Sequence, residues 1–184
     1  MTIPAAGRRL DQLLAPEYLF GLARRPIDEV RAMRAEAEQE ETDLSYLRRL
    51  LQGRLDILRA EQARRRGEGP GGSLIDALPG ILADDRSAPR GFGRHAAVEP
   101  SQLDSQRRLV ESLVTDSELS DPGRHDDDTL ARLVDVLDHE EREVSRKRRS
   151  VQAVMDALSA EIGRRYRDGA LDVGDVLSGE SPEA

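Results

Sequence analysis

The sequence predicts an all-α protein: an antiparallel two-helix coiled-coil hairpin with short accessory helices and a long flexible connector. Aromatic residues make up only 3% of the 184 residues, whereas β-sandwich and doubly wound α/β cores use many aromatic and β-branched residues. A composition rich in Ala, Leu, Glu and Arg favours helices instead. Two long segments without proline carry apolar residues at the near-heptad spacing of a coiled coil.

The first long helix is predicted over residues 26–66. Pro26 stands where a helix begins, and Asp28 in the next turn favours the positive end of the helix dipole. Glycine and proline residues follow directly and end the helix. Before it, residues 1–25 are predicted to form a short helical segment, whose apolar residues at 10–22 are expected to dock on a partner or on the coil.

Residues 67–128 are predicted to be a flexible connector with short helices, because they are rich in Gly, Pro, Ser and Asp. Two apolar islands within it, at 74–82 and 109–114, are expected to dock on a partner or back onto the coil. Acidic residues then favour the start of a second long helix, predicted over 129–168. The acidic residues 169–184 are predicted to be a disordered tail.

Charge and residue types exclude several classes of protein. A formal net charge of −8 argues against general DNA binding, since non-specific affinity for duplex comes from neutralising phosphates. The chain has no cysteine, and His95, His125 and His139 lie far apart in sequence, so no metal site is predicted. No apolar run approaches the ~20 residues that span a bilayer, and no signal-peptide pattern opens the chain. A cytoplasmic location without membrane contact is therefore expected.

One motif, E-x3-S-x2-R-x3-Q-x3-D, occurs once on each long helix at an offset of 100 residues. Steps of 4, 3, 4 and 4 residues place its five polar side chains within about 80° of helix arc, beside the apolar seam. A solvated helix face constrains charge but gives no reason to repeat Ser and Gln in register, so we predict a binding site. Its residues are Glu41, Ser45, Arg48, Gln52, Asp56, Glu141, Ser145, Arg148, Gln152 and Asp156.

These residue types suit a guanine nucleotide. An Asp carboxylate can accept hydrogen bonds from N1 and N2 of guanine, and Arg can donate two to its O6 and N7. Ser hydroxyl and Gln amide groups can serve phosphate oxygens or a ribose hydroxyl. Two identical motifs on antiparallel helices would be related by a pseudo-twofold axis, which matches the twofold symmetry of cyclic di-GMP.

All ten motif positions resemble the signature of RsiG-type anti-sigma factors, within residues 41–56 and 141–156. The resemblance implies that cyclic di-GMP binds the antiparallel coiled coil, as a stacked pair, and acts as a co-inhibitor. It further implies that the loaded protein sequesters a WhiG-type sigma factor, of the flagellar and sporulation class, and so blocks transcription initiation. The stacked pair, the co-inhibitor role and the sigma factor follow from the resemblance and not from composition or spacing.

Other function classes compete with this interpretation. A hairpin that binds structured RNA or the secondary channel of RNA polymerase would need a basic face or an acidic tip, whereas these helices mix both charges. A ligand-independent coiled-coil interaction protein would leave the motif residues solvated. An enzyme is not expected, because no histidine lies within helical reach of Ser45 or Ser145 and no phosphate-binding glycine loop follows a strand.

Overall fold

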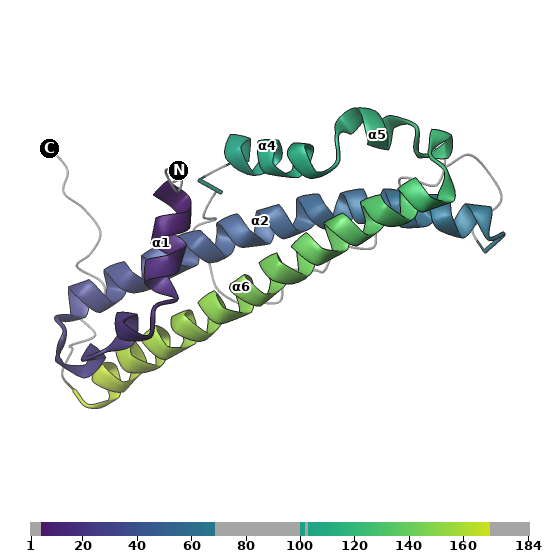
Figure 1. Ribbon diagram of the computed structural model, residues 1–184. Helices are drawn as coiled ribbons and strands as arrows, with labels where there is room; N and C mark the ends of the chain where they lie inside the picture. The colour runs from purple at the N-terminus through teal and green to yellow at the C-terminus, as the bar shows by residue number, and fades with distance from the viewer. Residues whose placement is uncertain (1–4, 69–99, 102, 170–184) are drawn as a thin grey trace, which may run out of the picture. The chain divides into compact units, whose positions relative to one another are not determined.

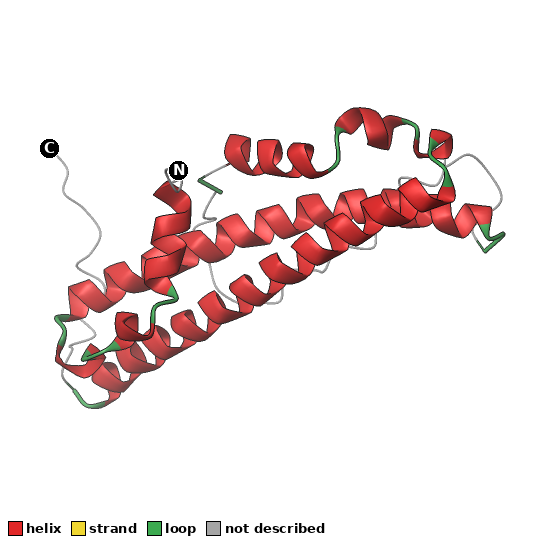
Figure 2. Ribbon diagram, in the orientation of Figure 1, coloured by secondary structure: helices red, strands yellow, loops and turns green. Residues whose placement is uncertain are grey.

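A computed structural model describes residues 5–68, 100–101 and 103–169 of the chain. These residues form helices, turns and loops without any strand, which confirms the predicted all-α fold (Figure 2). The elements, labelled in Figure 1, are α1 (Ala5–Leu13), the 3-10 helices η1 (Pro16–Leu19) and η2 (Leu22–Arg24), α2 (Ile27–Arg65), α4 (Leu103–Leu113), α5 (Asp116–Ser120), the 3-10 helix η3 (Pro122–Arg124) and α6 (Asp127–Arg167).

The chain divides into two compact units, each of which contains part of α2 and part of α6. The terminal unit comprises residues 1–41 and 149–184, and the central unit comprises residues 42–148. In both units the α2 residue number rises as the number of its α6 partner falls, so the two helices pack antiparallel. The pairs are Arg31 with Tyr166 and Glu41 with Gln152 in the terminal unit, and Arg48 with Glu141 and Arg65 with Asp127 in the central unit.

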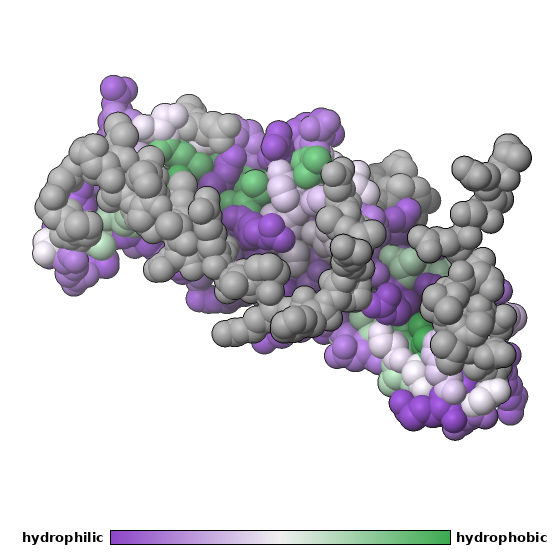
Figure 3. All heavy atoms as spheres, turned by 180° about the vertical axis from the view of Figure 1, so that it is seen from behind, coloured by the Kyte–Doolittle hydropathy of each residue, from purple (hydrophilic) through white to green (hydrophobic). Residues whose placement is uncertain are grey.

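The predicted apolar seam forms the core of both units. Leu51 and Leu58 of α2 are fully buried, as are Val151 and Leu158 of α6, and each buried Leu contributes roughly 1.5–3 kcal/mol. Met155, which the heptad pattern also assigns to the seam, is only half-buried. On the face shown in Figure 3, the hydrophobic residues that are visible lie in small separate groups among hydrophilic ones.

Within the predicted connector, α4 packs against α2 in the central unit (Figure 1). Val110 and Val114 are fully buried, and the Arg54 guanidinium donates to both of their carbonyl oxygens. Arg54 also forms an ion pair with Glu111 at 3.2 Å. The apolar island at 109–114 therefore docks back onto the coil, which is one of the two expected alternatives.

Two other sequence expectations concern residues that the structure does not describe. The apolar island at 74–82 and the predicted tail beyond residue 169 lie outside the described residues. In the N-terminal segment, only part of the apolar stretch at 10–22 is covered, because Leu13 of α1 is buried while Phe20 is 67% exposed.

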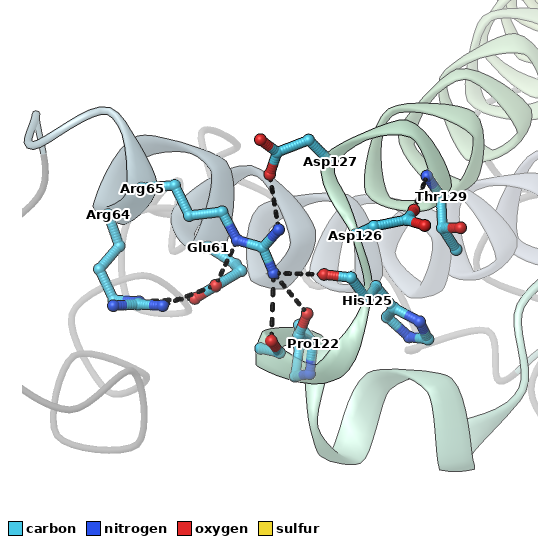
Figure 4. A network of polar contacts seen from close by, with 9 residues as sticks. Glu61, Arg64, Arg65, Pro122, His125, Asp126, Asp127 and Thr129 are labelled. Atoms are coloured by element: carbon cyan, nitrogen blue, oxygen red, sulfur yellow. Dashed lines mark hydrogen bonds and ion pairs between the residues drawn. The ribbon is translucent and has the colours of Figure 1, made fainter.

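A charged cluster at the end of α2 holds the turn that precedes α6 (Figure 4). The buried Glu61 carboxylate accepts hydrogen bonds from Arg64 at 2.7 Å and from Arg65 at 2.8 Å. Arg65 also donates to the carbonyl oxygen of His125 at 2.7 Å and pairs with Asp127 at 2.6 Å. One arginine thus connects the C-terminus of the first long helix to the N-terminus of the second.

The terminal unit contains the same cluster, 100 residues later in the sequence. Glu161 accepts hydrogen bonds from Arg164 and Arg165, each with a contact of 2.7 Å. Arg165 then donates to the carbonyl oxygens of Leu22 and Arg25, both at 2.8 Å, in the turn that precedes α2. The duplication therefore extends beyond the ten motif positions to the last turns of each long helix.

Replacing Arg65 by Ala should lower the free energy of unfolding by about 1–3 kcal/mol, because the change removes one of the two arginines that bind the buried Glu61 carboxylate and takes away the Arg65 donor from the carbonyl groups of the turn before α6. The matched control is Arg66→Ala. Arg66 and its ion-pair partner Glu68 are both more than half exposed, so its loss should cost less than about 1 kcal/mol. Urea unfolding of both variants measures the difference, and equal losses would contradict the structural role of Arg65.

The same cluster predicts an acid-dependent contribution to stability. Hydrogen bonds from Arg64, and then Arg65, lower the pKa of Glu61 from 4.5 to about 2, against the opposing effect of burial. Because the folded-state pKa is lowered, the contribution is complete above pH 4.5 and disappears as the pH falls towards 2. Thermal melts of the native chain and Glu61→Gln should therefore differ most at neutral pH and converge in acid. A difference that stays constant from pH 7 to 3 would contradict this assignment.

Candidate functional site

The ten motif residues lie on α2 and α6 and are divided between the two units. Each long helix is continuous through its motif copy, so the spacing of the sequence places the polar side chains along one side of the helix. The terminal unit contains Glu41, Gln152 and Asp156, and the central unit contains Ser45, Arg48, Gln52, Asp56, Glu141, Ser145 and Arg148. Each unit therefore includes residues from both copies of the motif.

In the central unit the Glu141 carboxylate joins the two motif copies. Its Oε1 atom accepts hydrogen bonds from Arg48 Nε at 2.9 Å, from Ser145 Oγ at 2.9 Å and from Gln52 Nε2 at 3.5 Å. Arg48 Nε also lies 3.0 Å from Ser145 Oγ. Because one partner is charged in each of the carboxylate contacts, these hydrogen bonds are stronger than neutral ones. These four motif residues are therefore not simply solvated flanks of a coiled coil.

Gln52 has hydrogen-bonding capacity that this cluster does not use. Its Oε1 atom is buried and accepts no hydrogen bond from the described residues. An unsatisfied buried acceptor costs about 1–3 kcal/mol, and such atoms in native proteins call for a functional or solvent explanation. A ligand with an N–H or O–H donor would satisfy it.

The terminal unit contains the matching contact between the two motif copies. Gln152 Nε2 donates to Glu41 Oε1 at 3.0 Å. Here the amide comes from α6 and the carboxylate from α2, whereas in the pair of Gln52 with Glu141 the amide comes from α2 and the carboxylate from α6. Antiparallel packing of two identical motifs requires such an exchange, so the contacts inside each unit agree with the predicted pseudosymmetry of residue types.

The two Asp residues predicted to bind guanine edges are accessible. Asp156 is exposed and Asp56 is half-buried, as is Arg148. A carboxylate in contact with solvent can exchange water for ligand donors without opening the apolar core.

The sequence analysis did not identify Asp43, a buried residue between the motif positions Glu41 and Ser45. Its carboxylate accepts two hydrogen bonds from Ser101, from the backbone N–H and from Oγ, each at 2.6 Å. The Asp43 carbonyl oxygen accepts a third from Gln106 Nε2 at 2.9 Å. These contacts connect the chain around α4 to α2 beside the first motif copy.

No sequence signal could have found this connection, because it is not repeated. The position corresponding to Asp43 in the second copy is Glu143, and the position corresponding to Arg54 is Val154. The packing of α4 on α2 thus distinguishes the first motif copy from the second.

In the part of the chain that the structure describes, no group of three or more His, Asp or Glu side chains could hold a metal ion. The helices in the same part include none that is long and apolar enough to cross a membrane.

Comparison with known families agrees with the duplication. The sequence profile of a family described as RsiG-like matches residues 16–82 and 116–180. The two matched segments cover more than half of the chain, and each contains one complete copy of the motif. Among curated proteins, none matches the chain.

Proposed function

Because the chain belongs to the RsiG-like family, we propose that it is an anti-sigma factor whose binding to its partner is controlled by cyclic di-GMP. Family membership indicates the anti-sigma role and, in general terms, a sigma factor as the partner. The regulatory nucleotide, and a WhiG-type sigma factor as the particular partner, are the proposed refinements. Sequestering that sigma factor would block transcription initiation.

We propose that all ten motif residues form the nucleotide site. The observation that supports it best is the cluster around Glu141, where guanidinium, hydroxyl and amide groups from both motif copies converge. The proposed site consists of Glu41, Ser45, Arg48, Gln52, Asp56, Glu141, Ser145, Arg148, Gln152 and Asp156.

Four of the five residue types have a direct chemical role at the nucleotide in this proposal. The carboxylates of Asp56 and Asp156 accept hydrogen bonds from N1 and N2 of guanine, while the terminal guanidinium nitrogens of Arg48 and Arg148 donate to O6 and N7 or the guanidinium stacks on the base. The Ser and Gln side chains bind phosphate or ribose oxygens. By resemblance to the family, the nucleotide binds as a stacked pair.

Control of the sigma factor then follows from linkage. The nucleotide exchanges hydrogen bonds among motif residues for hydrogen bonds to itself, which changes the surface that α2 and α6 present. If the sigma factor binds the loaded form better, each ligand must raise the affinity of the other by the same factor.

One observation favours a second candidate, a ligand-independent coiled-coil interaction protein. The sequence analysis expected such a protein to leave the motif residues solvated, but the Glu141 carboxylate is satisfied by other motif residues, so the cluster can also serve as a structural cross-link. Nucleotide titrations distinguish the two functions, because a cross-link alone has no affinity for guanine.

Replacing Asp56 or Asp156 by Ala should weaken binding of cyclic di-GMP about 10- to 100-fold, since a lost bidentate base contact costs roughly 1–3 kcal/mol. The matched control is Asp135→Ala, which removes an exposed Asp of α6 outside the motif. Calorimetric titration measures the affinities. Cyclic di-AMP, whose bases lack the N2 donor, should bind poorly, and equal affinity for both dinucleotides would exclude guanine recognition.

Affinity for a WhiG-type sigma factor should rise with the concentration of cyclic di-GMP, and the Arg48→Ala/Arg148→Ala protein should lose this dependence. The control is Arg49→Ala/Arg149→Ala, which removes the same charge from neighbouring exposed positions of both helices. Binding to immobilised sigma factor over a nucleotide series gives both affinities. Equal sigma binding with and without nucleotide would show that the motif is not a switch.

A further inference from the structure

We propose that Arg48 Nε, Gln52 Nε2 and Ser145 Oγ form a cradle for a phosphate group of the nucleotide, and that the Glu141 carboxylate fills this cradle until the nucleotide displaces it. The inference rests on the proposed nucleotide site and assigns one of its residues an opposing role. Glu141 is then an internal competitor of the ligand and not a contact to it.

The geometry around the Glu141 carboxylate is one that could also hold a phosphate group. All three donors point to a single anionic oxygen, Glu141 Oε1, at distances from 2.9 to 3.5 Å. They comprise one cation, one hydroxyl and one amide, which are also the groups that bind phosphate oxygens in proteins. The donors come from both motif copies, so the cradle exists only where α2 and α6 are paired.

Partial burial keeps the carboxylate in this position. The Glu141 side chain is 16% exposed and the Arg48 side chain 31% exposed, so water screens their attraction less than at an open surface. A phosphate cannot enter while Glu141 remains, because the two anions would share the same donors and repel each other.

Displacement has a measurable consequence for affinity. When only a fraction of molecules has an open cradle, the apparent affinity for the ligand is reduced by that fraction. Removing the charge at position 141 should open the cradle more often. A residue that merely held Arg48 in position for guanine would have the opposite effect, since removing its charge would loosen Arg48 and weaken binding.

The experiment is calorimetric titration of the full chain with cyclic di-GMP. Glu141→Gln keeps the size and one acceptor oxygen of the side chain but removes the negative charge that attracts Arg48. We expect it to bind about tenfold more tightly than the native chain. The matched control is Glu143→Gln, which removes a carboxylate two positions along α6 that pairs with Arg146 outside the cradle and should leave the affinity unchanged.

A second variant tests the cradle without changing charge. Ser145→Ala removes one donor and should weaken binding about tenfold, and circular dichroism melts establish that each variant is folded. If Glu141→Gln binds equally or more weakly, or if Ser145→Ala binds as the native chain does, the cradle is wrong although the nucleotide site remains. If the native chain binds no cyclic di-GMP at all, the proposed function itself fails.

Discussion

Burial of one apolar stripe on each long helix is the constraint on which the rest of the structure depends. Leu51, Leu58, Val151 and Leu158 are fully buried, and burying them sets the rotation of α2 and α6 about their own axes. The polar stripe follows the apolar one at a fixed angle on each helix, because both lie on the same regular backbone. Once the seam is buried, the motif residues of one helix must lie beside those of the other.

Duplication converts this packing into repeated polar contacts. An antiparallel pair of identical motifs brings Glu of one copy to Gln of the other, and both units contain such a contact. A second repeated contact lies near the helix ends, where Arg65 and Arg165 each donate to a carbonyl oxygen in the turn before the opposite long helix. A duplicated sequence therefore needs few residue types to stabilise a long pair of helices.

The α4 segment departs from this symmetry. Asp43 and Arg54 attach it to α2, whereas the corresponding residues of α6 are Glu143, which pairs with Arg146, and the uncharged Val154. These residues occupy the same stretch of α2 as the first motif copy, on positions the motif does not use. A partner that contacts α4 would therefore lie beside residues of α2 that are not repeated in α6, although the motif itself is duplicated.

The sequence by itself determined that the chain is all-helical and that two long helices pair, because helix propensity and near-heptad spacing are local properties. It also determined which residue types recur on each helix. Only the tertiary structure decided which of them meet: three donors converge on Glu141, Glu41 contacts Gln152, and Met155 is left half-buried. The attachment of α4 through Asp43 and Arg54 was likewise beyond the sequence. Such contacts join residues about 60 positions apart without any period, so no local pattern encodes them.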